Sequence, residues 1–245
     1  RLGVAPMEAV ALARRVIALP GLQLEGIYTH FASAEDDAQF SVEQARRFRA
    51  VLDTLAASGL QPSLVHANNS AALLHEPDTM FNLVRPGLLV YGIVPPGRRR
   101  EAAGLRRHLR PALAFKARVS LVKKILKNDS LSYGRAFIAP RRMRVAIVTA
   151  GYGDGYLRAG SNRAEVLIRG RRCRVLGRIT MDQTLANVSR VMGVACGDEV
   201  VLIGRPGDDE ITASELAAWC GTIPWEILTA ITHRVPRVYR GGQAA

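Results

Sequence analysis

The hydrophobic pattern of the chain changes its period once, on either side of a proline-rich basic segment at residues 94–111. Before this segment, short apolar runs alternate with patterns in which apolar residues recur every three or four positions, as in helices. After it, apolar and polar residues alternate along short runs separated by glycine or Asn-Asp turns, which indicates strands. The chain of 245 residues therefore predicts two domains, which we place at residues 1–105 and 106–245.

The first domain is predicted to hold parallel strands joined by crossover helices, as in barrel-like α/β folds. One helical pattern covers residues 6–19, and another begins at Ser41, where Gln44 completes a capping box. Strand patterns cover residues 22–32 and 63–67. Because working residues of such folds lie at the carboxyl ends of strands, the polar residues there are the candidates for function.

Polar residues follow the apolar strands at three points: His30, His66 with Ser70, and Arg85 with Gly87. Together they could bind a planar anion, with Ser70 and the N–H groups near Gly87 on a phosphate and Arg85 on a ring acceptor or carboxylate. Alternatively, Ser70 only caps a short helix and Arg85 ends a surface strand. The two histidines have no Asp or Cys at ligand spacing, so we expect no metal site.

The composition favours a cytoplasmic protein without a membrane or nucleic-acid partner. Three cysteines without CxxC spacing predict neither disulfides nor a zinc site, and no apolar stretch reaches the roughly 18–20 residues of a spanning helix. The formal charge of +13 would suit nucleic acid, with residues 97–110 as the best support, but the arginines are scattered and only four of the 34 basic residues are lysines. The chain opens on Arg1, inside what reads as a domain, so we expect that an N-terminal portion is missing.

The second domain carries three polar-aromatic turns between its strands, around Tyr133, around Tyr152, and around Met181 with Asp182. One glycine-rich turn alone signals little. Tyr152 could be an aromatic lid over a hydrophobic corner, and Asp182 a simple turn residue. Three such turns in this order are a more specific signal.

The ordered motifs of both domains resemble the alanine racemase family, pyridoxal-phosphate enzymes with a TIM-type barrel followed by a C-terminal β domain. In chain order, the motifs are THFASAED, HANNSAALL, VRPGLLVYG, SYGRAF, GYGDGYLR, GRITMDQ and TIPWEILTAITHRVPRVY. The resemblance covers essentially the whole chain. It implies a partial TIM-type (β/α) barrel followed by a C-terminal β-barrel-like domain, with pyridoxal 5′-phosphate as the cofactor.

The resemblance implies that Arg85 bonds the pyridine nitrogen of the cofactor. A permanent cation at that point keeps the nitrogen unprotonated and makes the ring a weaker electron sink. Ser70, together with the backbone at Gly87 and Leu88, would hold the phosphate, and His30 would lie near the ring.

Tyr133 is implied as one of two bases, because racemisation removes a proton from one face of Cα and returns it on the other, where the cofactor-binding lysine acts. A free phenol has a pKa near 10, so a tyrosine base needs cationic groups nearby, for which His30 and Arg85 are candidates. Met181 would offer its backbone N–H to the substrate carboxylate. Arg1 would lie by that carboxylate and by the phenolic oxygen of the cofactor.

Tyr152 and Asp182 would line the substrate entrance. An outer layer is implied at Glu35, His66, Arg158 and Arg178. In the family, residues of the β domain reach into the barrel of the other subunit, so the resemblance also implies a homodimer with shared active sites and a small amino-acid substrate.

Two features depart from the family pattern. The lysines of this chain all fall in the first strands of the β domain, at Lys116, Lys123, Lys124 and Lys127. The resemblance implies a Schiff-base lysine in an N-terminal KANAYGHG-like segment, which this sequence does not contain, so we expect this fragment alone to be inactive. His233 stands where the family has a tyrosine that touches the phosphate and narrows the entrance; histidine is smaller but can still donate a hydrogen bond to phosphate.

The leading hypothesis is the interconversion of L- and D-alanine by two-base racemisation, supplying D-alanine for peptidoglycan. One alternative is a racemase for serine or another larger amino acid, which His233 suggests. Another is a noncatalytic protein that binds pyridoxal phosphate or nucleic acid. Barrel-type carriers have no appended β domain, so the motifs after residue 111 count against the carrier.

Overall fold

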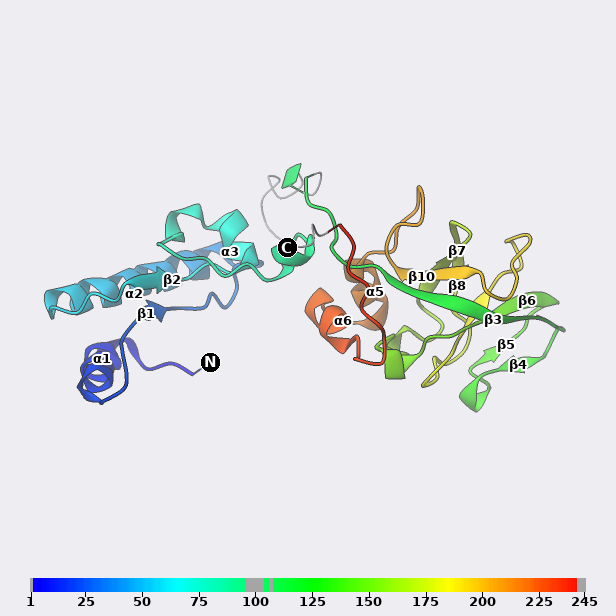
Figure 1. Ribbon diagram of the computed structural model, residues 1–245, viewed down its shortest axis with the longest axis horizontal. Coiled ribbons are helices and arrows are strands. Elements are labelled where there is room, and N and C mark those ends of the chain that lie inside the picture. Colours follow the sequence, from blue (N-terminus) through cyan, green and yellow to red (C-terminus); the bar gives the residue numbers. More distant parts are fainter. Residues whose placement is uncertain (1, 96–103, 106–107, 242–245) are drawn as a thin grey trace. The chain divides into compact units, whose positions relative to one another are not determined.

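The computed structural model describes residues 2–95, 104–105 and 108–241, and the chain divides into two compact units, Arg1–Ala112 and Leu113–Ala245 (Figure 1). The boundary predicted between residues 105 and 106 lies beside residues that the structure does not describe, and it stays a prediction.

The first unit contains two parallel strands connected by a long helix. Its elements are η1 (Pro6–Glu8), α1 (Ala9–Ala18), β1 (Gly26–Tyr28), α2 (Ala38–Ala57), β2 (Leu64–His66), α3 (Ser70–His75), η2 (Pro77–Thr79) and η3 (Leu88–Tyr91). Strand β1 pairs with β2 in parallel, with Tyr28 opposite His66, and Leu83 adds a further parallel bridge to His66. The predicted parallel strands with a crossover helix are thus confirmed.

Helix α2 begins earlier than its sequence pattern predicts, at Ala38 instead of Ser41. The carboxylate of Asp37 accepts the N–H of Phe40 at 2.9 Å and caps the helix. Ser41 therefore lies inside the first turns, where its hydroxyl donates to the carbonyl of Asp37 at 2.7 Å. The side chain of Gln44 reaches the end of β1 instead of completing a capping box, so that expectation was wrong.

The strand predicted over residues 22–32 is also shorter, because β1 pairs along only three residues of β2. One face of this pair packs against α2. The core there consists of Phe31, Ala34, Ala45, Phe48, Ala67, Ala71 and Ala72, with Ile27, Leu52, Val65 and Phe81 packed against it. This packing holds the carboxyl ends of β1 and β2 beside each other.

The second unit is a six-stranded antiparallel sheet that nearly closes on itself. Its elements are β3 (Phe115–Ile125), β4 (Ser130–Leu131), η4 (Tyr133–Arg135), β5 (Phe137–Ile138), β6 (Met143–Val148), η5 (Tyr152–Asp154), η6 (Arg158–Gly160), β7 (Glu165–Ile168), β8 (Arg171–Arg174), β9 (Thr184–Asn187), β10 (Glu199–Ile203), α5 (Ala213–Cys220) and α6 (Pro224–Ala230). The strand order is β8-β7-β10-β3-β6-β9, and a bridge between Val175 and Ala186 brings the two outermost strands together. The predicted change to β structure after residue 111 is confirmed.

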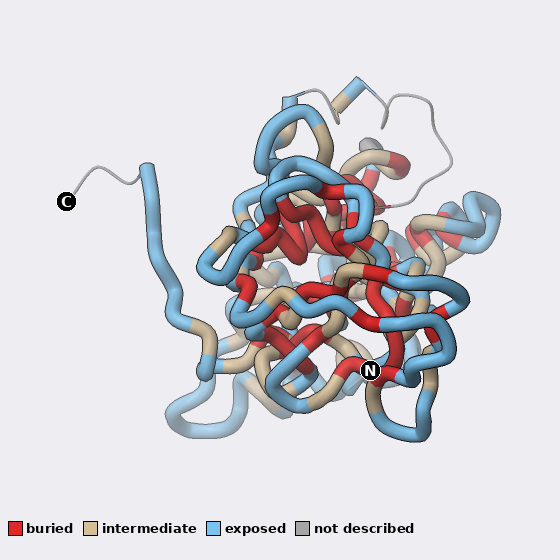
Figure 2. Tube along the Cα trace, turned by 90° about the vertical axis from the view of Figure 1, so that its right-hand side faces the viewer, coloured by how far each residue is buried: buried red, intermediate tan, exposed pale blue. Residues whose placement is uncertain are grey.

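Along β9 buried residues alternate with half-buried ones, whereas β10 is buried at four successive positions. Figure 2 colours the chain by this burial. Valine and isoleucine side chains that are less than 2% exposed fill the interior, among them Val145, Val148, Val166 and Ile168. The turns singled out in the sequence follow or precede these strands. Tyr152 follows β6 and Met181 precedes β9 of the six-stranded sheet, whereas Tyr133 follows β4 of a separate two-stranded sheet formed by β4 and β5.

Candidate active site

The guanidinium of Arg85 ties the ends of β1 and β2 together. Its Nη2 donates to the backbone carbonyls of Thr29 and Ala67, both at 3.0 Å. The same nitrogen lies 3.4 Å from Nδ1 of His30, and Nη1 bonds Nδ1 of His66. Arg85 is half-buried, so it does not simply end a surface strand. The sequence-predicted residues His30, His66 and Arg85 therefore form one cluster.

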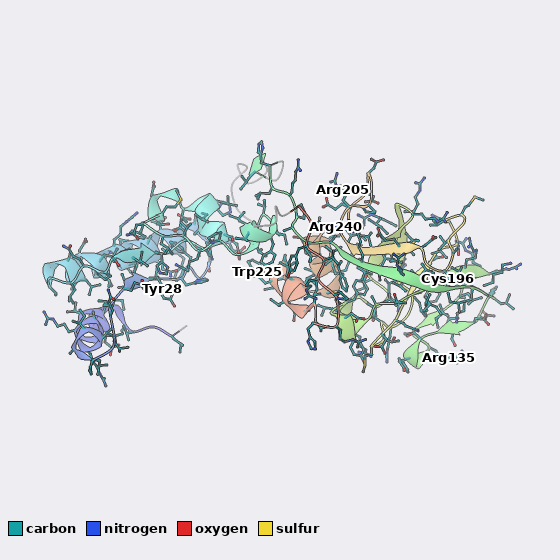
Figure 3. The ribbon with its side chains drawn as sticks, viewed as in Figure 1. Tyr28, Arg135, Cys196, Arg205, Trp225 and Arg240 are labelled. Carbon is teal, nitrogen blue, oxygen red and sulfur yellow. The ribbon has the colours of Figure 1, made fainter. Side chains whose placement is uncertain are left out.

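The imidazole of His66 is held in its neutral form. Guanidinium can only donate hydrogen bonds, so Nδ1 of His66 must accept, which leaves the ring proton on Nε2. Burial, and secondly the positive charge of Arg85, lower the pKa of His66. The ring of Tyr28 stacks on His66 with 4.9 Å between centroids, and the carbon Cζ of Arg85 lies 5.1 Å from the Tyr28 centroid. Tyr28 thus covers the cation, with about half of its own surface exposed (Figure 3).

Ser70 is buried and joins the start of α3 to the segment after Arg85. Its Oγ accepts the N–H of Gly87 at 2.7 Å and the N–H of Leu89 at 3.3 Å. The cap of α3 is Asn69, whose side chain accepts the N–H of Ala72 at 2.9 Å, so the interpretation of Ser70 as a mere cap was wrong. Since Oγ accepts both of these bonds, its hydroxyl hydrogen is not used in them and could be donated to a phosphate oxygen.

Tyr133 lies on a tight turn between β4 and β5, and its side chain is 72% exposed. Backbone φ is positive at Ser132 (64°), Gly134 (67°) and Arg135 (49°), a conformation that non-glycine residues rarely adopt. A Cβ at Gly134 would lie 3.3 Å from Cζ of Arg178, so that guanidinium packs over the turn. The structure therefore brings Tyr133 and Arg178, both predicted from sequence, to one place.

The turns that carry Tyr152 and Met181 are bonded to each other. The N–H of Tyr152 donates to Thr180 O at 3.0 Å, and that of Gly153 donates to Met181 O at 2.9 Å. A Cβ at Gly151 would overlap these carbonyl oxygens, which explains the glycine. Met181 and Tyr152 are both exposed beside this junction.

Arg234 links the same two turns by its charge. Its Nη2 lies 2.7 Å from Asp182 and its Nε lies 3.4 Å from Asp154. These carboxylates raise the pKa of Arg234, and the larger cause is the hydrogen bond that Arg234 donates to Asp182. His233 precedes Arg234 in the chain and is exposed.

Other predicted residues lie apart from these contacts or outside the structure. Glu35 is half-buried, and burial, followed by the charge of Asp36, raises its pKa. Arg158 is exposed in η6. Arg1 lies outside the described residues. Lys116 pairs with Glu199 at 2.9 Å on the sheet of the second unit, and the sequence places no lysine before it.

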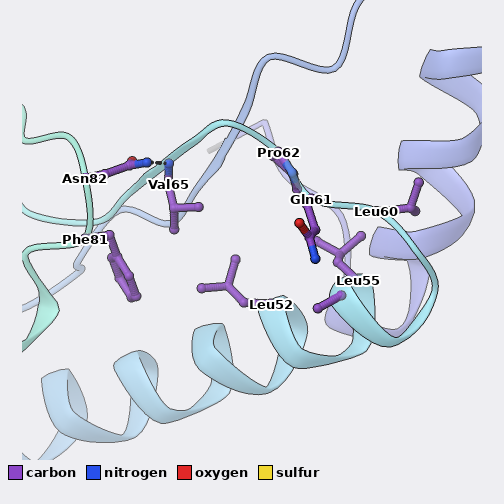
Figure 4. A pocket seen from close by; sticks show the side chains of 9 residues that line it. Leu52, Leu55, Leu60, Gln61, Pro62, Val65, Phe81 and Asn82 are labelled. Carbon is purple, nitrogen blue, oxygen red and sulfur yellow. Dashed lines mark hydrogen bonds between the residues drawn. The ribbon is translucent and has the colours of Figure 1, made fainter.

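A cavity of about 380 Å³ lies elsewhere on the first unit, beside α2 and β2 (Figure 4). Its walls are apolar except for Gln61 and Asn82, and none of the predicted site residues lines it. Over the described ranges, no helix combines the length and apolarity needed to cross a membrane. In the same part of the chain, no three His, Cys, Asp or Glu side chains gather as a metal site.

The two units define the architecture as an α/β unit followed by a nearly closed β barrel, and comparison with known proteins gives the family. Residues 1–95 match the family described as "Alanine racemase, N-terminal domain", and residues 112–239 match "Alanine racemase, C-terminal domain". The chain belongs to the alanine racemase family, whose members are isomerases that use pyridoxal 5′-phosphate. The predicted fold class and family resemblance are confirmed.

Individual relatives agree with this assignment. The alanine racemases of Symbiobacterium thermophilum and Carboxydothermus hydrogenoformans are each 44% identical to this chain, over 100% and 95% of it. The crystal structure of alanine racemase from Streptomyces lavendulae matches 99% of this chain with a TM-score of 0.89 at 37% identity. That from Bacillus anthracis with bound L-Ala-P matches 99% with a TM-score of 0.85 at 36% identity. The chain spans 62–64% of the length of these four proteins.

Sequence reasoning missed several polar residues of the site. Gln44 donates to Thr29 Oγ1 at 2.9 Å and to His30 O at 2.8 Å, and so holds the end of β1. Arg234 and Asn162 join turns that are far apart in the chain. Their partners lie in turns that are distant in the chain, so no local sequence pattern reveals these contacts.

Proposed function

We propose that this chain supplies most of the active site of a cytoplasmic alanine racemase, which interconverts L- and D-alanine and provides D-alanine for peptidoglycan. The observation that carries the proposal is the cation at the strand ends. The guanidinium of Arg85 contacts two carbonyl oxygens and two imidazoles. Two residues further along the chain, the N–H of Gly87 bonds Ser70.

The residues of the first unit fit the phosphate and the ring nitrogen of pyridoxal 5′-phosphate. Ser70 Oγ accepts two N–H groups and retains a hydrogen that a phosphate oxygen can accept. Arg85 would bond the pyridine nitrogen, with His30 close to the ring. The covalent link needs a lysine, and the first 115 residues contain none. In the proposed enzyme an N-terminal segment like that of the family would supply it.

When bound, pyridoxal 5′-phosphate withdraws electrons from an attached amino acid and so acidifies the hydrogen on its Cα. Tyr133 would take that proton, or return it, on one face of Cα through its phenolic oxygen. Its position on an exposed turn supports this role, because a base that serves a neighbouring chain must project from its own domain. Arg178 lies against the turn and places a positive charge beside it.

The substrate carboxylate would bind at the backbone N–H of Met181, with Tyr152 and Asp182 lining the entrance. Two carboxylates stand in this region, Asp154 and Asp182, and both would repel an anionic substrate. The guanidinium of Arg234 lies between them and offsets their charge.

A homodimer would complete each site, with Tyr133 of one subunit serving the cofactor of the other. His233 supports a variant of the proposal, a racemase for serine or another larger amino acid, because its exposed imidazole stands where the family has a bulkier tyrosine. Rates with alanine, serine, lysine and arginine would separate the two: preference for alanine by more than about tenfold supports the first.

The test joins the residues that precede the matched region in the Symbiobacterium thermophilum relative to the start of this chain. We expect the joined protein to be dimeric, to show the absorbance of lysine-bound cofactor and to convert L-alanine to the racemate. The matched control replaces the donor's cofactor-binding lysine with alanine. Cofactor bound without any racemisation would contradict the proposed activity.

A further inference from the structure

We propose that Asn162 is a positioning residue that fixes the turn carrying Tyr133. This inference rests on the role proposed above for Tyr133. Asn162 follows η6 on a different loop of the second unit, 29 positions from Tyr133 along the chain.

Both ends of the Asn162 amide are engaged. Its Nδ2 donates to the carbonyl of Ala136 at 2.9 Å, and its Oδ1 accepts the N–H of Gly177 at 2.6 Å. Both bonds are partly buried. A carbonyl can only accept and a backbone N–H can only donate, so these partners fix the amide in one orientation.

The backbone of Asn162 is itself anchored. Its φ is 58°, a left-handed conformation in which asparagine is one of the better tolerated residues. Its carbonyl oxygen accepts from Nη2 of Arg174 at 2.9 Å. Strand β8, which ends at Arg174, therefore provides the fixed point from which the side chain reaches the turn.

The Tyr133 turn needs such support, because its backbone is strained. Ser132 (φ 64°, ψ 176°) and Arg135 (φ 49°) adopt sparsely populated backbone conformations, which cost on the order of 1–3 kcal/mol each. The flanking hairpin of β4 and β5 pairs only two residues on each side. Ser132 Oγ donates to Arg178 O at 2.6 Å and holds the start of the turn, while Asn162 holds its end at Ala136.

Both ends of the turn are thus tied to the segment of Gly177 and Arg178. Ser132 bonds Arg178 directly, and Ala136 is connected to Gly177 through the amide of Asn162. A proton transfer requires the phenolic oxygen of Tyr133 to come within about 2.6–3.2 Å of its partner. A displacement of about 1 Å can lower the rate by about 100-fold. Asn162 would therefore affect the rate without touching the substrate.

Two substitutions separate the halves of the amide. Asn162→Asp keeps the acceptor for Gly177 but sets a carboxylate oxygen against the carbonyl of Ala136. Asn162→Gly tolerates the left-handed backbone and removes both bonds. The matched control is Asn128→Asp, at another left-handed asparagine (φ 72°) of the same unit, for which no side-chain hydrogen bond is seen within the described residues.

The first readout is amide hydrogen exchange by NMR, which needs no activity. The N–H of Arg135 donates to Ser132 O at 3.1 Å inside the turn. We expect Asn162→Asp to speed exchange at Arg135 about tenfold while Gly177 stays protected, and Asn162→Gly to speed both. Asn128→Asp should change neither amide. Unchanged exchange at Arg135 in both Asn162 variants would overturn the inference.

The second readout is kcat in the joined full-length racemase. We expect Asn162→Asp to lower kcat by about 10–100-fold with KM within threefold of the parent, and to add nothing in a Tyr133→Phe background. If Tyr133→Phe lowers kcat by about 100-fold or more but Asn162→Asp leaves kcat per folded molecule unchanged, Asn162 is merely structural and the inference fails. If Tyr133→Phe leaves kcat unchanged, the proposed base role fails instead.

Discussion

Replacing Arg85 with lysine should loosen the ends of β1 and β2, although the positive charge is retained. The guanidinium bonds two carbonyls at 3.0 Å through one nitrogen and His66 through another. A lysine has a single nitrogen and cannot reproduce this planar fork. Hydrogen bonds to a charged group are worth about 1.5–3 kcal/mol each, so the loss of two of them costs about 3 kcal/mol or more.

The assay is hydrogen exchange of peptides that cover Gly26–Tyr28 and Leu64–His66, followed by mass spectrometry. A cost of about 3 kcal/mol in local opening corresponds to about 100-fold faster exchange, since each factor of ten is about 1.4 kcal/mol. Arg49→Lys is the control, because Arg49 makes an exposed bond to Asp78 O in the same unit. If exchange in Arg85→Lys stays within threefold of the parent, the guanidinium hydrogen bonds do not stabilise the ends of β1 and β2.

Three further outcomes follow from single contacts. The pKa of His66 is lower in the folded chain than its ordinary value of 6.5, so below pH 6.5 the unfolded chain binds more protons than the folded chain. The melting temperature should therefore fall as the pH drops below 6.5, and His66→Gln should remove this part of the fall. Gly155→Ala should destabilise the second unit by about 2–4 kcal/mol in urea unfolding, because φ is 99° and the new Cβ would overlap a carbonyl of α6. Maleimide should label exposed Cys196 (Figure 3) first and Cys173 only on unfolding, since burial raises the pKa of Cys173 to about 11; equal rates would contradict the burial of Cys173.

The fold could be predicted from the sequence wherever the hydrophobic period was clear. The period of two after residue 111 identified the strands of the barrel, and the alternation before it identified β1, α2 and β2. Boundaries were less accurate, because they depend on side-chain bonds that compete locally. Asp37, and not Ser41, caps α2, and Gln44 bonds Thr29 at the end of β1 instead of completing a capping box.

The candidate site was predictable as a set of polar residues at strand ends and turns, but its bonding was not. Nothing in the sequence indicates that Ser70 accepts the N–H of Gly87, or that Arg234 lies between Asp154 and Asp182. Such contacts join residues 17 to 80 positions apart and exist only once the chain has folded. The bonds of Asn162 to Ala136 and Gly177 could not be predicted from the sequence for the same reason.

The central claim is that Tyr133 is the base on one face of the substrate, and incorporation of solvent deuterium at Cα tests it most directly. In the joined full-length protein, L-alanine and D-alanine are incubated separately in D2O and followed by NMR. We predict that Tyr133→Phe slows exchange of one enantiomer by about 100-fold or more and leaves the other within about tenfold. Equal loss for both enantiomers, or no loss for either, would contradict it.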